Sequence, residues 1–420
     1  MDSIAANSPL GRLAAHLEKL GDPRRLRRPV HLFSDILIIG LCSFFTGGRT
    51  FVDMADCAAT LEPWLRTFLK LPGGLPSHDT FNRVFAALDS RGMEDVLRLW
   101  TSELTIPRES GDQPPPALRH PALDGKVLRG SRTGSGAGAA PRARAVVNLW
   151  LADHGLVLAQ RKIPEDCGEI IQAPLLLRRI ALKNTVVTAD AAHAQTGTAA
   201  EIIGLGGDYP LCVKGNQAAT RDAILTLLEP AIAALPDGHF HSVHKEHGRL
   251  EERRAWVCAD LTDFGPRGLW KGLGAVAVRE SRFENLITGK TSVERRCFLT
   301  SLTPARAGAS SKAGAAARDK AMAELVARLA RGHWKVENSL HWRLDVLMGE
   351  DACRTRGGGA PINLAAMRRI TLNVLKAHPP FPGKRGADMS IRSRQYVASI
   401  SPSYLRSLIE GVRPPKHVIV

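Results

Sequence analysis

The sequence predicts a mixed α/β fold in which a helical first quarter is followed by a core of strands and helices. Two observations support this prediction. Apolar residues recur at helical spacing through about the first 110 residues, whereas from Ala117 onward short apolar strands alternate with helices. With 420 residues and 44% apolar content, the chain is long enough for two or three domains with packed cores. A wholly disordered chain is therefore excluded.

The helical first quarter is predicted to form an amino-terminal domain over residues 1–110. Its helices are separated by Gly, Pro and turn residues and cover residues 32–45, 51–69, 79–88 and 93–104. Ser77 precedes one of these helices and is a typical helix cap. A proline-rich stretch at 111–116 marks the end of the domain.

The core is predicted to begin with three strands in succession, at residues 123–128, 146–151 and 156–163. A helix, a strand, a helix and a strand follow, at residues 169–182, 185–188, 198–204 and 209–213. This order, β-β-β-α-β-α-β, is that of a ribonuclease-H-like mixed sheet. We place the first part of such a core at residues 117–215.

A β-rich insertion is predicted at residues 216–302, with strands near 242–257, 275–280 and 293–300. After a linker at 304–316, one long helix runs from about residue 319 to 347, within the last part of the core at 317–375. A basic tail, residues 376–420, ends the sequence.

The charge of the chain is strongly positive and unevenly placed. The formal net charge is +16, and from Arg354 to the end twelve basic residues stand against two acidic ones. A second basic cluster contains Arg24, Arg25, Arg27 and Arg28. A solvated surface explains either cluster alone, but two together favour a polyanion partner, with nucleic acid ahead of a membrane. The helix after Ser77 is then either part of a small DNA-binding unit or an ordinary packed helix.

Other features favour a reducing cytoplasm. The longest near-apolar run, Ile36–Phe45, is about half of the ~20 residues that a bilayer requires, so we expect no membrane partner. The amino terminus has no secretory pattern. The seven cysteines are odd in number and never form C-x-x-C, which disfavours disulfides and thiolate zinc ligation.

Motif and spacing disfavour two kinds of cofactor site. No G-x-x-x-x-G-K-[ST] loop occurs, so a phosphate-cradling nucleotide site is not expected. His241, His244 and His247 have a spacing that invites a zinc reading, but the segment is predicted to be extended, where side chains three residues apart do not converge. We expect exposed or turn histidines instead.

Two acids stand at the ends of strands that are predicted to be neighbours. Asp124 interrupts an apolar strand, and a buried carboxylate is costly unless it is paired or binds metal. Asp190 closes the run 186–189 at the carboxyl end of a strand, where ligand sites of α/β sheets gather. Asp153 is a rival for the second position, although a hairpin turn explains it more simply.

A third acid comes from the long helix. His333, Glu337, His341 and Asp345 recur every four residues and share one helix face. A surface stripe of ion pairs and a single-helix zinc site are alternatives, but the zinc motif H-E-x-x-H is absent. Three carboxylates can hold two Mg²⁺ or Mn²⁺ ions for in-line displacement at phosphorus.

Five segments carry recognisable motifs: Asp124–Ser131, Thr188–Gln195, Lys214–Gln217, His247–Glu251 and His333–Val346, the last followed by Glu350-Asp351. Together they resemble the H-repeat-associated insertion-sequence transposases, a group of DDE transposases. The resemblance runs from about Pro29 to about Leu375.

The resemblance implies that Asp124, Asp190 and Glu337 are the catalytic and metal-binding residues, with two Mg²⁺ or Mn²⁺ ions. It implies DNA cleavage at the terminal inverted repeats of the element, strand transfer into target DNA, and a homo-oligomer that holds two ends. We assign DNA contacts to polar residues of the matched segments: Lys126, Arg129, Lys214, Asn216, Arg249, His333, His341 and Arg343. The helical amino-terminal domain then serves DNA binding or assembly. We also expect the basic excess after Arg354 to contact DNA, and the protein to be cytoplasmic and nucleoid-associated when bound to DNA.

The chain departs from the family pattern in two places. Residues 165–170 read Glu-Asp-Cys-Gly-Glu-Ile where Lys-Ser-Asn-Glu-Ile is usual, which puts a DNA-facing Lys in doubt. His333 and Arg343 stand near the Arg and Lys positions of a Tyr-Arg-Glu-Lys signature. In related transposases an aromatic residue of the insertion can stack on a flipped base, but for Trp256 and Trp270 we favour core packing over such stacking.

Two other functions stay open at this stage. One is a DNA-binding protein derived from a transposase that is no longer mobile. The other is a nuclease of the same fold that hydrolyses DNA without joining it.

Overall fold

The structure is a computed structural model that describes residues 9–24, 29–105, 118–133, 142–246, 248–378 and 389–410. The predicted boundary at 111–116 and the residues Arg25, Arg27, Arg28 and His247 lie outside these ranges. The chain forms two compact units. The first comprises Met1–Pro116, Gly125–Gln172 and Glu337–Val420, and the second comprises Ala117–Asp124 and Ala173–Val336. The units are assembled from interleaved segments, and the predicted domain boundaries, which follow the chain, stay a prediction.

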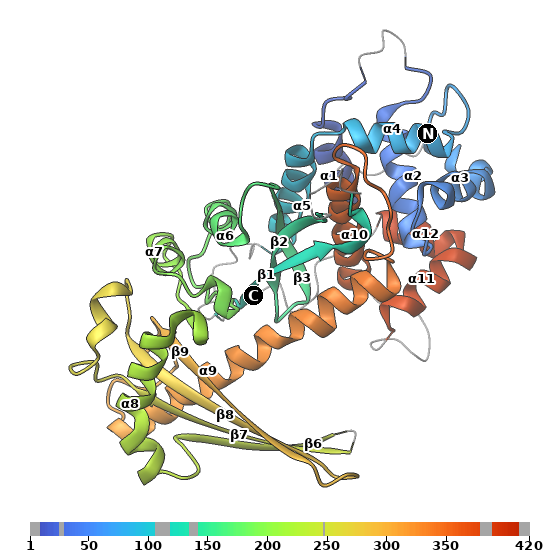
Figure 1. Cartoon of the computed structure of the whole chain (residues 1–420). Helices are drawn as coiled ribbons and strands as arrows, with labels where there is room; N and C mark the ends of the chain where they lie inside the picture. Colours follow the sequence, from blue (N-terminus) through green and yellow to red (C-terminus); the bar gives the residue numbers. More distant parts are fainter. Residues whose placement is uncertain are drawn as a thin grey trace. The chain divides into compact units, whose positions relative to one another are not determined.

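The first unit contains the predicted helical region (Figure 1). Its helices are α1 (Pro9–Glu18), α2 (Phe33–Phe45), α3 (Phe51–Leu65), α4 (His78–Ala87) and α5 (Ser90–Thr105). The Ser77 hydroxyl accepts the N–H of Thr80 and caps α4 as predicted, and Thr50 forms a capping box with Asp53 at the start of α3. Helix α2 is buried over most of its length, which accounts for its nearly unbroken apolar sequence.

Segments from both ends of the sequence share the core of the first unit. Strands β2 (Arg144–Leu151) and β3 (Leu156–Ile163) form an antiparallel hairpin whose turn contains Asp153, as the sequence predicted. Helix α5 and the nearly fully buried α10 (Ala360–Ala377) both pack against β3. Two further helices, α11 (Ile391–Ile400) and α12 (Pro402–Glu410), follow in the segment that the sequence analysis assigned only as a basic tail.

The strand order is β3-β2-β1-β4-β5-β9-β8-β7-β6. Strand β1 (Pro121–Leu128) is continuous between the units, and it pairs in parallel with β4 (Thr188–Ala189), which pairs in parallel with β5 (Pro210–Val213). Helices α6 (Glu169–Leu177) and α7 (Thr196–Gly204) precede β4 and β5 respectively. An antiparallel β2-β3 hairpin followed by parallel β1, β4 and β5 is the ribonuclease-H-like arrangement, so the predicted fold class is confirmed.

The predicted β-rich insertion lies in the second unit and extends the same sheet. It comprises α8 (Ala218–Ala234), β6 (Phe240–Glu246), β7 (Arg249–Cys258), β8 (Ala275–Asn285) and β9 (Thr291–Thr300), and β9 pairs with β5 (Figure 1). Helix α9 (Ala315–Val336) packs its apolar side against this sheet, where residues such as Leu325, Leu329 and Phe298 form one core cluster. Within the described ranges, no helix is both long and apolar enough to cross a bilayer.

Candidate active site

Asp124 and Asp190 come from neighbouring parallel strands of the second unit. Leu123 of β1 lies opposite Ala189 of β4, and the two aspartates are the next residues along each strand. Parallel strands place equivalent residues at the same edge of a sheet. Asp124 is half-buried and Asp190 is exposed, so both carboxylates are placed for contact with a ligand.

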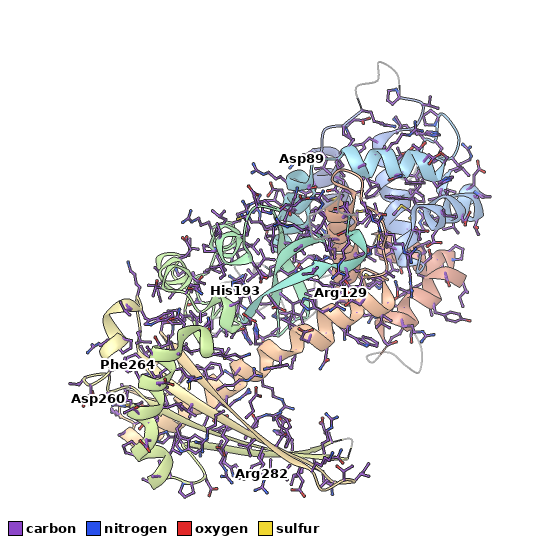
Figure 2. All side chains as sticks on the ribbon, viewed as in Figure 1. Asp89, Arg129, His193, Asp260, Phe264 and Arg282 are labelled. Carbon is purple, nitrogen blue, oxygen red and sulfur yellow. The ribbon has the colours of Figure 1, made fainter. Side chains whose placement is uncertain are left out.

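The loop after Asp190 is fixed by short hydrogen bonds. The N–H of Ala192 donates to Oδ1 of Asp190 at 2.6 Å, which orients the carboxylate. The Asn216 side-chain amide donates to the carbonyl of Ala191, also at 2.6 Å, so the segment after β5 is tied to the segment after β4. The neighbouring Lys214 is exposed. The same loop contains the fully buried His193, which is labelled in Figure 2.

Two histidines of the second unit meet at the hydroxyl of Thr188, two residues before Asp190. Nε2 of His120 lies 2.9 Å from this hydroxyl, and Nδ1 of His333, from α9, lies 3.2 Å from it. Burial lowers the pKa of His120 to about 3 and, partly offset by the nearby Asp190, the pKa of His333 to about 4. Both imidazoles are therefore neutral at pH 7. The ring of His120 approaches α9 at Gly332, where a Cβ would stand 2.5 Å from the ring.

The chain continues from α9 into the first unit through two π-helical turns, Glu337–His341 and Arg343–Leu347. Such turns are rare and are enriched at functional sites. The side chain of Glu337 is 63% exposed and its Oε2 lies 3.5 Å from Nδ1 of the buried His341. Glu337 thus presents an accessible carboxylate, whereas His341 is oriented toward it from the interior.

Lys126 of the first unit is only 8% exposed and forms an internal ion pair. Its ammonium lies 2.9 Å from the carboxylate of Asp345 and 3.4 Å from Asp351, both on the segment after Glu337. Burial raises the pKa of Asp345, and Lys126 opposes that rise. The Lys126 side chain therefore connects β1 to the segment that carries the third predicted acid.

The other predicted DNA contacts differ in exposure. The side chain of Arg129 is 75% exposed and lies 3.4 Å from Asp351, Arg249 is exposed at the start of β7, and Arg343 is half-buried. In sum, Asp124, Asp190, Lys214, Asn216 and His333 gather at one edge of the second unit. Lys126, Arg129, Glu337, His341 and Arg343 belong to the first.

Comparison with known proteins identifies the family of the chain. A family model described as a DDE transposase-associated domain matches residues 14–101 of the chain, and a model described as a transposase DDE domain matches residues 115–374. The chain belongs to the DDE transposase family.

Relatives of this DDE transposase cover most of its length. It is 30% identical to the H repeat-associated putative transposase YhhI of Escherichia coli strain K12, over 96% of this chain and 98% of that protein. It is 38% identical to an uncharacterized protein in the dhlA 3′ region of Xanthobacter autotrophicus, over 68% of this chain and 93% of that protein. A solved piggyBac transposase synaptic complex with hairpin DNA aligns with a TM-score of 0.40 at 10% identity, a likeness too low to support an inference.

Membership of the DDE transposases implies phosphoryl transfer on DNA assisted by a divalent metal. The donor set suits such an ion. Carboxylate oxygens, which Asp124 and Asp190 carry at one sheet edge and Glu337 carries at an exposed position, are of the hard type that Mg²⁺ and Mn²⁺ prefer.

Burial confirms the favoured interpretation of two tryptophans of the transposase and corrects the expectation for part of its basic excess. Trp256 and Trp270 are 2% and 3% exposed, and Trp256 donates to the carbonyl of Leu235, so core packing rather than base stacking describes both. Arg368 and Arg369 are 1% and 0% exposed in α10, which removes these two charges of the basic excess after Arg354 from any DNA-contacting surface. Arg394 is buried as well.

The sequence analysis missed a buried ion pair in the first unit. Arg369 lies 2.7 Å from Glu350 and donates through Nε to Asn148 of β2 at 2.7 Å, and all three residues are no more than 1% exposed. The sequence analysis noted Glu350-Asp351 after the last motif segment, but nothing in the sequence indicated that the Glu350 side chain is buried. The pair joins α10 to the sheet.

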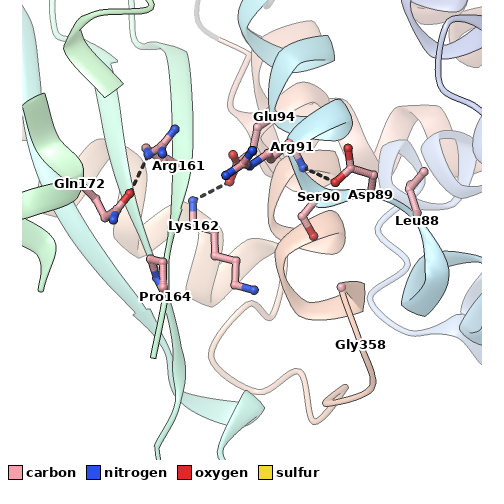
Figure 3. Close-up of a pocket in the computed structure, with 11 residues that line it drawn as sticks. Leu88, Asp89, Ser90, Arg91, Glu94, Arg161, Lys162, Pro164, Gln172 and Gly358 are labelled. Atoms are coloured by element: carbon pink, nitrogen blue, oxygen red, sulfur yellow. Dashed lines mark hydrogen bonds between the residues drawn. The ribbon is translucent and has the colours of Figure 1, made fainter. Parts of the chain in front are cut away.

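A polar cavity of about 520 Å³ lies elsewhere in the first unit, between the start of α5 and β3. In Figure 3, Glu94 accepts the backbone N–H of Lys162 at 2.6 Å, and Arg161 is bonded to Gln172. Its lining contains both acidic and basic side chains. None of the predicted catalytic residues lines it.

Proposed function

We propose that this DDE transposase cleaves DNA at the terminal inverted repeats of its element and joins the ends to target DNA, with Asp124, Asp190 and Glu337 as catalytic residues. The observation that best supports this proposal is the parallel register of β1 and β4, which aligns Asp124 with Asp190. Glu337 follows directly after α9, whose His333 reaches the hydroxyl of Thr188 beside Asp190. Because Glu337 is the residue after α9 and α9 reaches the segment beside Asp190, we favour Glu337 as the third carboxylate.

The three carboxylates would hold two Mg²⁺ or Mn²⁺ ions. When bound, such a pair activates the attacking water or 3′-hydroxyl and stabilises the leaving oxygen. The protein's own part is orientation. The N–H of Ala192 fixes the Asp190 carboxylate, and the neutral His120 and His333 hold Thr188 without adding positive charge that would compete with metal.

We propose that the exposed cations Arg129, Lys214 and Arg249 contact DNA phosphates directly. Arg343 and His341 would act from the segment that carries Glu337. The bonds already made by Lys126 and Asn216 point to a supporting role, in which they orient β1 and the loop after Asp190. The remaining expectations, a homo-oligomer on paired ends and a cytoplasmic, nucleoid-associated protein, follow from the same proposal.

The test is Asp190→Asn, because an asparagine oxygen can still accept the N–H of Ala192 while the negative charge is lost. We expect Mg²⁺-dependent cleavage of DNA carrying the element's flanking repeats to fall by at least about 10³-fold. End binding should change by less than about threefold. The matched control is Asp153→Asn, which neutralises an exposed turn acid on the same sheet and should retain activity.

Wild-type cleavage by Asp190→Asn would contradict the assignment, as would activity of the parent protein in EDTA. A strand-transfer assay with pre-cleaved ends separates the two remaining functions. Cleavage without joining would identify a nuclease, and end binding without either reaction would identify a DNA-binding derivative.

A further inference from the structure

The β-rich insertion of the second unit contains three arginines side by side on the sheet face that packs against α9. Arg279 of β8 is directly opposite Arg296 of β9 and Ala255 of β7, and Arg253 is two residues from Ala255 on that same face. Residues opposite each other in antiparallel strands have Cβ atoms about 4.5–5.5 Å apart. Like charges at this separation destabilise the sheet unless something offsets them.

The carboxylates nearby do not balance this cluster. Arg253 is paired with Glu251, and Arg296 lies 2.7 Å from Glu294. For the side chain of Arg279, no ion pair is found in the described part of the chain. Burial, followed by repulsion from Arg296 and Arg253, lowers the pKa of Arg279 to about 10. The guanidinium is still protonated at pH 7, so the cluster has one positive charge in excess.

Three polar atoms of the cluster are buried without a hydrogen-bond partner among the described residues: Nε of Arg279, Nη1 of Arg253 and Oγ of Ser281. Ser281 is opposite Arg253 in the β7-β8 register and is fully buried, while Arg279 and Arg253 are 5% and 7% exposed. A buried, unsatisfied polar group costs about 1–3 kcal/mol, and several together are unusual in a native protein. All three groups can donate a hydrogen bond, so an acceptor with more than one oxygen would satisfy them together.

The cluster continues a line of charged groups that begins at the predicted catalytic edge. Asp190 follows β4, and Lys214 follows β5 at the position next to Arg296 of β9. The exposed ring of Trp334 on α9 lies 4.4 Å from the guanidinium of Arg296. On the same helix, Arg331 adds positive potential at Arg253. Positive groups therefore extend from Asp190 across four further strands of the sheet, β5, β9, β8 and β7.

We propose that Arg253, Arg279, Ser281 and Arg296 form a binding site for a phosphodiester group of DNA, on a strand that runs from the carboxylates across the β-rich insertion. The assignment of the ligand as DNA rests on the proposed function. The site itself is an oxyanion site: guanidinium N–H groups and a hydroxyl donate to phosphate oxygens, and the anion neutralises the excess charge.

The first experiment tests the oxyanion site without DNA, metal or catalysis. The thermal midpoint of the full chain is compared in sodium phosphate and in sodium chloride of equal ionic strength, for the parent protein, Arg279→Met and the control Arg282→Met. Arg282, which is labelled in Figure 2, lies on the same strand and is exposed. It is three residues from Arg279, so the alternation of a strand places it on the opposite face. We expect phosphate to raise the midpoint of the parent and of Arg282→Met equally, and that of Arg279→Met by less than half as much.

Methionine is chosen because proteins usually tolerate the replacement of a buried charged side chain by an apolar one of similar length. If Arg279→Met does not fold, Ser281→Ala removes one donor with little change in volume, and it should also reduce the phosphate effect. An equal phosphate effect in the parent and both variants would overturn the proposal. So would the absence of any phosphate-specific effect in the parent, which would mean that water alone satisfies the buried donors.

The second experiment identifies the ligand as DNA. The affinity for a DNA duplex is measured at several salt concentrations, and the slope of log affinity against log salt should be less steep by about 0.9 in Arg279→Met. An unchanged slope together with a lost phosphate effect would overturn DNA as the ligand. A failed cleavage assay with both effects intact would instead overturn only the proposed function.

Discussion

At the scale of single residues, the side chains that support the sheet edge are neutral, and the charges lie around them. His120 is 5% exposed, is bonded to Thr188 and lies against Gly332 of α9. Its depressed pKa has a consequence for stability. Between about pH 6.5 and 3 the unfolded chain binds a proton at this position and the native protein does not, so native stability falls as the pH falls.

We therefore predict that acid destabilisation is weaker in His120→Gln, whose amide can still reach Thr188 but does not titrate. Between pH 6.5 and pH 5 the parent protein should lose about 2 kcal/mol more unfolding free energy than the variant. Urea unfolding at the two pH values measures this difference. The other histidines contribute equally to both proteins, so parallel pH dependence would mean that His120 is protonated in the native state.

At the scale of elements, the edge strand β3 is closed by side chains instead of another strand. Asn373 of α10 is fully buried, and it accepts the N–H of Val157 at 2.8 Å and donates to the Val157 carbonyl at 2.9 Å. Its amide also donates to the Thr101 hydroxyl of α5. Glu94 accepts the N–H of Lys162 farther along the same strand. Two helices thus satisfy an edge that would otherwise be open to pairing with another chain.

We predict that Asn373→Leu lowers the free energy of unfolding by about 3 kcal/mol or more, because it removes the side-chain partner of the buried N–H and carbonyl groups of Val157. The variant should also aggregate more readily. Chemical denaturation and light scattering check both effects. Asn338→Leu, at an exposed position, is the control and should stay within about 0.5 kcal/mol of the parent. A loss below about 1 kcal/mol in Asn373→Leu would contradict this view of the edge.

Local patterns predicted most elements of this protein. Short apolar segments became β1, β2, β3 and β5, and segments with helical apolar spacing became α2 to α5. Two features were not predictable in this way. Strand β4 is only two residues long, and the turns after α9 are π-helical, which depends on how Glu337–His341 packs rather than on its composition.

At the scale of the whole molecule, the formal charge of +16 overstates the charge that DNA can meet. Arg368, Arg369 and Arg394 are buried and bonded to internal acceptors. The cations that remain accessible include Arg129, Lys214 and Arg249. Affinity for DNA should therefore reflect a limited set of phosphate contacts.

We predict that affinity for a duplex of unrelated sequence falls by about 10³-fold or more between 50 and 200 mM salt, as for a protein that makes about six or more phosphate contacts. Fluorescence anisotropy with labelled DNA gives the slope. Lys214→Met should make the slope less steep by about 0.9, whereas the buried Arg369 should contribute nothing in molecules that remain folded. A salt-independent affinity would contradict an electrostatic mode of binding.

The sequence by itself determined the fold class and the family, and it indicated Asp124, Asp190 and Glu337, because strand and helix periodicity and short motifs are local properties. The tertiary structure decided which charges are internal. Lys126 faces Asp345, Arg369 faces Glu350, and Nε of Arg279 is buried without a hydrogen-bond partner among the described residues. Each of these facts depends on how separate segments of the chain pack together. The energy of a charge depends on the solvent and partners around it, which are fixed only when the chain has folded.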